Sequence, residues 1–275
     1  MALSVLNNIP SLVAQNQLTI TEANLQKTLD QLSSGSRINS GADDAAGLAI
    51  ANGLQANITA LTQSVQNANN GVGSLQVADG ALGQVTTLLN RAVTLGTESA
   101  TGTVSDTQRG ALDAEYQSIL QEINSIGSNT QFNGAAVFSA TSTSIFLSDS
   151  TTAGTTTITV TTGALSASGV GGLGLTGNLL TQGAAVTELG NINTAISTVA
   201  SSRGVIGASV NRLQAASTVI STEIQNLTTA EDGITAADIP TVVDNLSKYS
   251  ILEQTGISAL AQANTQQQQV LNLLH

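Results

Sequence analysis

A long stripe of apolar residues dominates the first third of the chain. Between residues 54 and 89, apolar or small side chains recur in steps of four and three residues. A period of about 3.5 residues keeps one face of a helix against a partner helix. A helix of about 36 residues would span about 54 Å, so we expect other helices to lie along it. The principal members of the stripe are Leu54, Ile58, Leu61, Val65, Leu75 and Leu89.

Two later segments repeat this spacing. The pattern predicts a first long helix over about 45–100, with glycines at 71 and 73 as the one point where it could break, a second helix over about 107–128, and a third over about 185–230. The third helix is far away in sequence, yet it is the partner that the first needs. The stripe residues of the two later helices are Tyr116, Ile119, Ile123, Ile206, Val210, Leu213, Ile220 and Leu227.

The two ends of the chain predict polar, weakly amphipathic helices. The first covers residues 2–34 and stops at Gly35, since glycine readily adopts the left-handed conformation that ends a helix. The last covers 240–274, and Pro240 suits its first turn. The connection at 230–240 reads as a hinge. Helices this polar have only marginal stability in isolation and need to pack against other elements to stay folded.

The composition changes near residue 139. From there to about 182 the chain consists mostly of Ser, Thr and Gly, and the run TTTITVTTG has the alternation of a strand. Just before this segment, Asn133-Gly134 predicts a tight turn between short β-prone pieces. We expect a small β-rich insert with a weak core, placed at the end of a helical hairpin opposite the termini. Its removal should then be mild.

These elements predict a mainly α fold. The N- and C-terminal regions would form a long, coiled-coil-like antiparallel helical rod, with the β-rich insert between them in sequence. The predicted parts are an N-terminal helical segment at 1–42, the two halves of the rod at 43–138 and 185–232, the insert at 139–184, and a C-terminal helical segment at 233–275.

The composition of the chain narrows the range of functions that it can have. Charged residues make up 9% of the chain, against roughly 25% in an average globular protein, and a surface so poor in charge is typical of one that other subunits cover. Seven Lys and Arg against 18 Asp and Glu give a net charge of −11, which argues against binding nucleic acid. There is no Trp, with only three Phe and two Tyr, so burial must come from aliphatic side chains.

The chemistry of an enzyme is missing from the sequence. There is no Cys, and the one His is His275, so we expect no catalytic triad, no metal site and no cofactor. The N-terminus has no secretory signal pattern, and no apolar run approaches the length of a membrane span. Glycines at 169, 171, 174 and at 172, 174, 177 match G-x-G-x-x-G, but one β-rich patch offers no parallel sheet for a dinucleotide.

Long segments at both ends resemble bacterial flagellins. The runs QLSSGSRINSGADDAAGLAIANGLQANI and LTQSVQNANNGVGSLQVADGAL, the TQFNG at 130–134, and NLTTAEDGITAADIPTVVDNLSKYSILEQTGISALAQANTQQQQVLNLL all follow that family's pattern. The resemblance covers about 1–138 and 185–275, in order and with the expected spacing, and leaves the insert unmatched.

This resemblance implies a structural, non-enzymatic subunit that polymerises with copies of itself into the flagellar filament. It implies export through the flagellar type III apparatus with the help of a chaperone, a secreted extracellular location, and contacts with hook-associated junction and cap proteins. It also places Arg91, Leu95 and Glu115 on the patch that a flagellin-sensing Toll-like receptor recognises. The plainer alternative is that Arg91 and Glu115 are solvated charges and that Leu95 packs within the filament.

Two other classes stay open from the sequence. A flagellin-like hook–filament junction protein shares the terminal pattern but would assemble as a short ring. An amphipathic binder of lipid surfaces is disfavoured, because the helices lack a basic polar face and aromatic anchors.

Overall fold

The computed structural model describes residues 8–149, 156–168 and 172–273. Its contacts divide the chain into two compact units, residues 1–56 with 226–275 and residues 57–225. We call them the terminal unit and the central unit. The predicted fold class, mainly helical with a small β-rich region in the middle of the chain, is confirmed. We call residues 137–181 the mid-chain segment. The five-part division of the chain stays a prediction.

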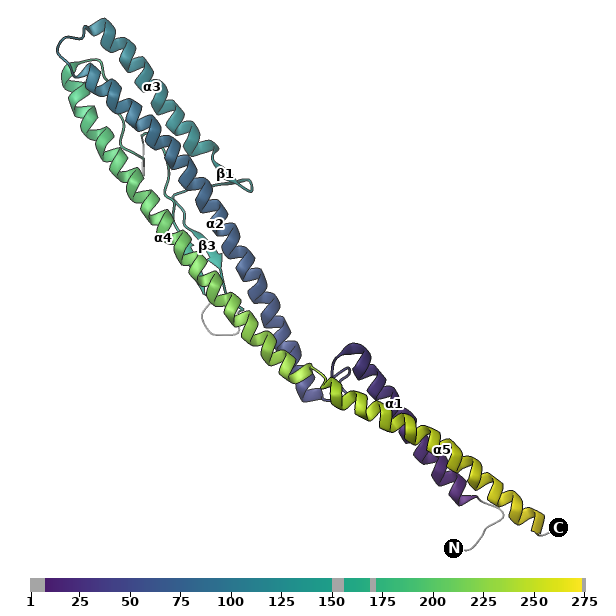
Figure 1. The fold of residues 1–275 in the computed structure, drawn as a ribbon. Helices are drawn as coiled ribbons and strands as arrows, with labels where there is room; N and C mark the ends of the chain where they lie inside the picture. Colours follow the sequence, from purple (N-terminus) through teal and green to yellow (C-terminus); the bar gives the residue numbers. More distant parts are fainter. Residues whose placement is uncertain (1–7, 150–155, 169–171, 274–275) are drawn as a thin grey trace. The chain divides into compact units, whose positions relative to one another are not determined.

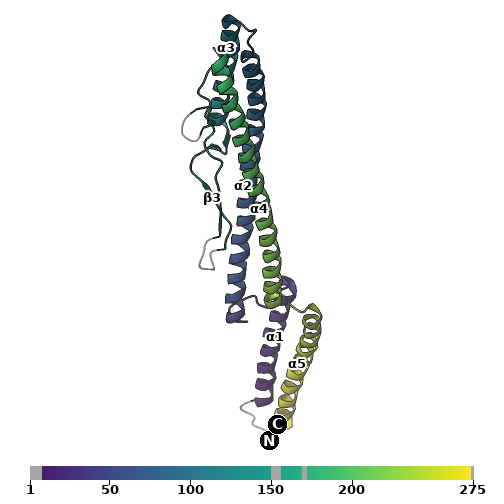
Figure 2. The same ribbon diagram turned by 90° about the vertical axis from the view of Figure 1, so that its left-hand side faces the viewer.

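Three helices lie side by side in the central unit (Figures 1 and 2). They are α2 (Ala45–Ser99), α3 (Asp106–Asn129) and α4 (Gln182–Thr235), and α2 and α4 also reach into the terminal unit. All three match predicted helices within a few residues. Helix α3 begins with a capping box, in which the Ser105 hydroxyl accepts from the Gln108 N–H and the Gln108 side chain accepts from the Ser105 N–H.

Helix α2 is continuous through the glycines where the sequence allowed a break. A Cβ added at Gly71 would collide with the Ile145 side chain of the mid-chain segment and lie 3.2 Å from Leu213 Cδ1 of α4. The glycine therefore stands where two neighbours approach the helix backbone, and the packing offsets its cost of about 1 kcal/mol relative to alanine. The start of α2 is capped by Asp44, whose Oδ1 accepts from the Gly47 N–H at 2.8 Å.

Two small antiparallel sheets follow α3. The first pairs β1 (Gln131–Phe132) with β2 (Ala135–Ala136) across the predicted Asn133-Gly134 turn. Both turn residues have positive φ, 51° and 77°, as a two-residue hairpin turn requires. The second pairs β3 (Thr143–Phe146) with β4 (Thr157–Val160), with Ile145 opposite Ile158.

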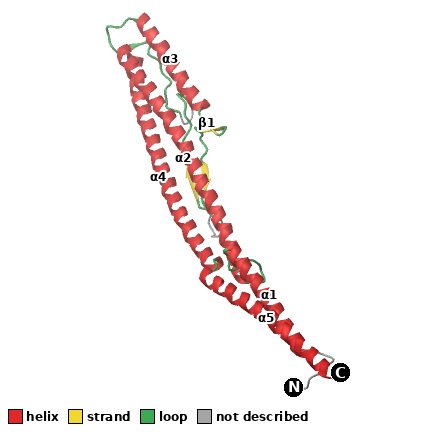
Figure 3. Cartoon of the chain, turned by 45° about the vertical axis from the view of Figure 1, so that its right-hand side comes forward, coloured by secondary structure: helices red, strands yellow, loops and turns green. Residues whose placement is uncertain are grey.

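The expected position of the insert was wrong. The segment after β2 does not sit at one end of the helices but runs along them within the central unit (Figure 3). Asn67 of α2 donates to the Phe146 carbonyl at 3.2 Å, and the Ser99 hydroxyl at the far end of the same helix donates to the Leu179 carbonyl at 2.6 Å. Its core is also stronger than expected, since its apolar side chains Ile145, Leu147, Ile158, Val160, Leu173, Leu175 and Leu179 are buried.

The terminal unit consists mainly of α1 (Ile9–Ser34) packed against α5 (Ile239–Leu273). Helix α1 is capped at its start by Asn8, whose side chain accepts from the Ser11 N–H at 3.1 Å, and at its end by Gly35 with φ 70°. Residues 2–7 of the predicted first helix lie outside the described residues, as do Gly169 and Gly171 of the first glycine motif.

The hinge predicted at 230–240 is much shorter in the structure. Helix α4 continues to Thr235, so only residues 236–238 separate it from α5. The extension is stabilised because Arg37, in the loop after α1, donates its backbone N–H to the Thr235 carbonyl and its Nη2 to the Ile234 carbonyl. These bonds satisfy carbonyls at the end of α4 that have no partner within the helix.

Candidate assembly surfaces

The predicted stripe residues line the helix contacts of the central unit to different depths. The buried ones are no more than 7% exposed, whereas five others are only half-buried, and two of these, Leu54 and Leu227, belong to the terminal unit. Buried members are Leu61, Leu75, Leu89, Tyr116, Ile119, Ile123, Ile206, Leu213 and Ile220. Half-buried members are Leu54, Ile58, Val65, Val210 and Leu227.

An ion pair links the exposed faces of α2 and α3. Arg91 Nε lies 2.7 Å from Glu115 Oε1, and Arg91 Nη2 lies 3.0 Å from Oε2, which is a bidentate arrangement. The hydrogen bond from Arg91 holds the pKa of the Glu115 carboxyl below its ordinary value. Leu95, one turn further along α2, has no exposed surface. A partner that binds this face of the subunit therefore meets the ion pair and not the leucine.

A second bidentate pair joins α4 to α2. Arg203 Nε lies 2.7 Å from Asp79 Oδ1, and Nη2 lies 3.1 Å from Oδ2. The Arg203 hydrogen bond lowers the pKa of the Asp79 carboxyl. Both side chains are 42% exposed, so the pair contributes little net stability. It joins two residues that are more than 100 positions apart in sequence.

The central unit holds one carboxylate that sequence reasoning missed. Glu188 of α4 is 1% exposed, and its Oε1 accepts from the Tyr116 hydroxyl at 2.5 Å while its Oε2 accepts from Asn191 Nδ2 at 2.8 Å. Its partners are neutral donors. A Cβ on Gly177 of the mid-chain segment would collide with this carboxylate. The network therefore ties α3, α4 and the mid-chain segment together in a water-poor site, where satisfied polar groups specify one arrangement.

This network predicts sensitivity to alkali. Burial, and then the hydrogen bond to Glu188, raise the pKa of Tyr116 far above its ordinary value of about 10. A raised folded-state pKa means that its contribution to stability is complete below about pH 10 and is lost as the pH rises beyond it, because the unfolded chain then releases the proton first. We expect the urea midpoint of the native protein to fall above about pH 10, and that of Tyr116→Phe to fall less steeply. Equal slopes for the two proteins would contradict the assignment.

Side chains of the helices hold the backbone of the mid-chain segment. A Cβ on Gly127 of α3 would collide with the Leu165 carbonyl, so the two backbones touch there. Such a close approach needs glycine. Hydrogen bonds between α3 and the segment include those from Gln117 Nε2 to the Gly177 carbonyl at 3.3 Å, from the Leu179 N–H to Asp113 Oδ1 at 2.7 Å, and from the Ala167 N–H to Asn124 Oδ1 at 2.8 Å.

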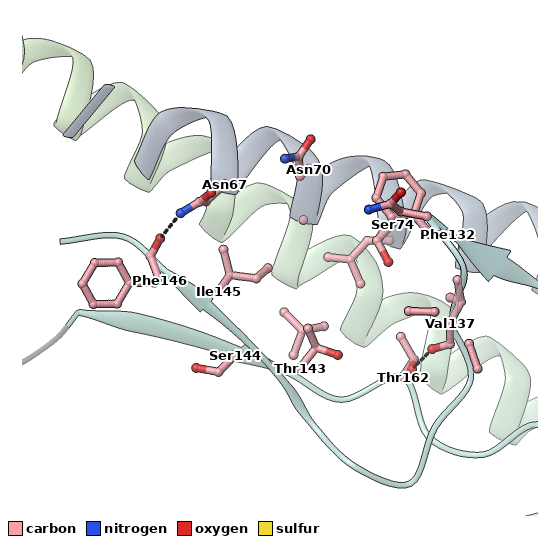
Figure 4. A pocket seen from close by; sticks show the side chains of 16 residues that line it. Asn67, Asn70, Ser74, Phe132, Val137, Thr143, Ser144, Ile145, Phe146 and Thr162 are labelled. Carbon is pink, nitrogen blue, oxygen red and sulfur yellow. Dashed lines mark hydrogen bonds between the residues drawn. The ribbon is translucent and has the colours of Figure 1, made fainter. Parts of the chain in front are cut away.

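A groove of about 910 Å³ opens between α2 and the two small sheets (Figure 4). The lining includes Asn70 and Ser74 of α2, Phe132 of β1, and Ser144 and Ile145 of β3, and none of its lining residues carries a charge. Asn67 and the Phe146 backbone join across one end of it, as the dashed line in Figure 4 shows. The groove is therefore an uncharged surface, lined by apolar side chains together with amides and hydroxyls, on an otherwise acidic protein.

The terminal unit exposes many large apolar side chains. Its α1–α5 pair buries mainly small or polar groups, such as Thr21 and Thr28, whose hydroxyls donate to carbonyls of their own helix. Leu29 of α1 is 41% exposed. The exposed apolar residues of the pair are Ile9, Leu12, Val13, Ile20, Leu29, Ile239, Val243, Ile251, Leu252 and Ile257, at 41–67% exposure.

Metal and membrane sites have no candidate among the described residues. No group of three or more His, Cys, Asp or Glu gathers there as a metal site would need. None of the helices in the described ranges has the length and apolar character to cross a membrane. Of the features that the sequence analysis missed, only the Glu188 carboxylate left a signal, as an acidic residue at an inward position of a helix.

Known proteins with similar sequences are flagellins and flagellar filament proteins. Family models described as the bacterial flagellin N-terminal and C-terminal helical regions match residues 5–143 and 189–274. A flagellar filament 30.7 kDa core protein of Treponema maltophilum is 32% identical over 280 residues, and a flagellin of Halalkalibacterium halodurans is 32% identical over 271. Each alignment covers 98% of both chains.

Among solved structures, the crystal structure of Bacillus cereus flagellin matches with a TM-score of 0.49 and 29% identity, over 60% of this chain and 94% of that one. The two family models together span most of the sequence, and both full-length relatives are more than 30% identical. This chain is therefore a member of the bacterial flagellin family.

Proposed function

We propose that this protein is a structural subunit that polymerises with copies of itself into a flagellar filament. The observation that carries the proposal is the exposed apolar surface of the α1–α5 pair. Ten large apolar side chains on these two helices are at least 41% exposed, and exposed apolar surface beyond a few scattered residues favours an interaction site. The polar positions of these helices are rich in amide side chains. A second copy of the same helices therefore has the chemistry to cover their exposed apolar side chains.

Polymerisation also accounts for the weak internal packing of the terminal unit. Between α1 and α5 the long-range polar contacts include Asn8 Nδ2 to the Ala263 carbonyl at 3.1 Å and the Ser11 hydroxyl to Asn264 Oδ1 at 3.0 Å, both at the end of the pair. A pair held by few buried residues gains stability when a neighbour covers its apolar side chains, because binding to the folded form stabilises it by mass action.

The finer parts of the proposal follow from family membership. We infer export through the flagellar type III apparatus with a chaperone, an extracellular location on the flagellum, a role in swimming motility, and contacts with hook-associated junction and cap proteins. The named relatives of similar length, a flagellin and a filament core protein, support the filament over the junction. Recognition by a flagellin-sensing Toll-like receptor would use the Arg91–Glu115 pair, since Leu95 is buried.

The test is seeded polymerisation of two matched variants. Leu12→Asp places a charge on an exposed apolar position of α1, whereas Asn16→Asp adds the same charge one turn later at an exposed polar position. Purified protein is mixed with short filament fragments. Filament growth is followed by electron microscopy, and helix content by circular dichroism. We expect the wild type and Asn16→Asp to form long filaments and Leu12→Asp to form none, because the charge would be buried without a partner.

Three outcomes would count against the proposal. Filaments of equal length from both variants would show that the α1 surface is not the contact. A wild-type protein that forms only short rings would indicate the junction protein. A wild-type protein that stays monomeric with seeds present would remove self-assembly from its function.

A further inference from the structure

The chain contains three Asn-Gly pairs, which lie in different kinds of secondary structure. Asn52-Gly53 and Asn70-Gly71 lie inside α2, whereas Asn133-Gly134 forms the turn between β1 and β2. Such a pair is chemically reactive because glycine leaves its own backbone nitrogen unhindered next to the asparagine side chain. Whether the reaction proceeds depends on the freedom of that nitrogen.

In the helix, the nitrogen is occupied. The N–H of an interior helical residue donates to the carbonyl four residues earlier, and the asparagine backbone is fixed in the right-handed region. Reaction at either helical pair requires local opening of α2. Gly71 is further restrained because Ile145 packs on it.

In the turn, the nitrogen is free. Asn133 and Gly134 are both exposed, and within the described part of the chain neither the Gly134 N–H nor the Asn133 side chain takes part in a hydrogen bond. The β1–β2 sheet has only two residue pairs, Gln131 with Ala136 and Phe132 with Ala135. An isolated ribbon this short opens easily, which gives the Asn133 side chain access to the conformation that the reaction needs.

We propose that Asn133 is a site of spontaneous deamidation. Hydroxide removes the proton of the Gly134 amide, and that nitrogen attacks Asn133 Cγ. The new C–N bond forms as the Cγ–Nδ2 bond breaks, and ammonia leaves with a proton taken from water, which yields a cyclic succinimide. Water then opens the ring: addition at Cγ gives aspartate, and addition at the main-chain carbonyl gives isoaspartate.

The two products act differently on the neighbouring groove. Aspartate tolerates the positive φ that Asn133 holds, so the hairpin should persist with one added negative charge on the uncharged groove lining. Isoaspartate carries the main chain through an extra methylene, which a two-residue turn of this type does not accommodate. The hairpin then opens, and Phe132, whose ring lies 3.4 Å from the Cβ position at Gly73, loses its place against α2.

The experiment uses the full-length protein as a monomer, so it is independent of whether filaments form. Native protein and protein unfolded in guanidinium chloride are incubated at mildly alkaline pH, and the three Asn-Gly peptides are quantified by mass spectrometry that separates aspartate from isoaspartate. In the native protein we expect Asn133 to react more than about tenfold faster than Asn52 and Asn70, because opening a helix interior is rarer than opening an exposed turn. In the unfolded protein the three rates should converge.

Asn52-Gly53 is the matched control, since it is as exposed as the turn and differs in being helical. Native rates that are equal at Asn133 and Asn52, or no conversion at Asn133, would overturn the proposal. A rate difference that persists unchanged in guanidinium chloride would also overturn it, because the cause would then be the flanking sequence rather than the fold.

Discussion

Replacing Leu213 with aspartate is expected to unfold the central unit. Leu213 of α4 has no exposed surface, and its Cδ1 lies 3.2 Å from the Cβ position at Gly71 of α2, so there is no room for water beside it. An unpaired buried charge costs at least about 3–5 kcal/mol, which is comparable with the whole stability of many domains, about 5–15 kcal/mol. Urea unfolding followed by circular dichroism measures the loss directly.

The adjacent residue provides the control. Gln214 is exposed on the same helix, so Gln214→Asp adds the same charge and should change the free energy of unfolding by no more than about 0.5 kcal/mol. If Leu213→Asp unfolded at the same urea concentration as Gln214→Asp, the packing of α4 against α2 would be wrong. Loss of filaments should follow in the first variant alone.

The second large effect is expected at a glycine. Adding a methyl group in Gly127→Ala forces α3 and the Leu165 carbonyl apart, and that carbonyl belongs to the main chain and cannot rotate away as a side chain would. The movement also strains the bond from the Ala167 N–H to Asn124 Oδ1. Overpacking of this kind costs about 1–3 kcal/mol, and faster proteolysis of the mid-chain segment should accompany the loss of thermal stability.

Gly110→Ala is the same change in the same helix with the opposite expected sign. Nothing lies within 4 Å of the Cβ position at Gly110, so alanine there should stabilise α3 by about 0.5–1 kcal/mol. Two variants that shift stability in the same direction would contradict the docking of the mid-chain segment on α3.

The same contacts reverse the expectation that removing the insert is mild, since its loss would uncover the apolar faces of α2, α3 and α4.

The helices of this protein could be predicted because their signals are local. Steps of four and three residues placed α2, α3 and the start of α4 within a few residues of their observed bounds, and Gly35 and Asn133-Gly134 marked a helix end and a turn from the conformations those residues permit. The end of α4 was missed because its stabilising partner, the Arg37 loop, is almost 200 residues away in sequence.

Which side chains lie on the surface of the protein was only partly foreseeable. A low charge content indicated a surface to be covered, but only the structure separated Leu95, which is buried, from Arg91 and Glu115, which pair on the surface. The partners of Arg203 and of Glu188 could not be anticipated, because periodicity does not say which polar residues of two helices meet.

The sequence by itself determined that this chain is helical at both ends, poor in charge, free of cysteine, and similar to flagellins over all but the mid-chain segment. Only the tertiary structure decided where that segment lies. A Ser-, Thr- and Gly-rich run has little apolar pattern to orient it, and its position depends on backbone contacts at Gly71, Gly127 and Gly177 and on bonds to helix side chains. Such contacts form between elements distant in sequence and therefore leave no local periodicity.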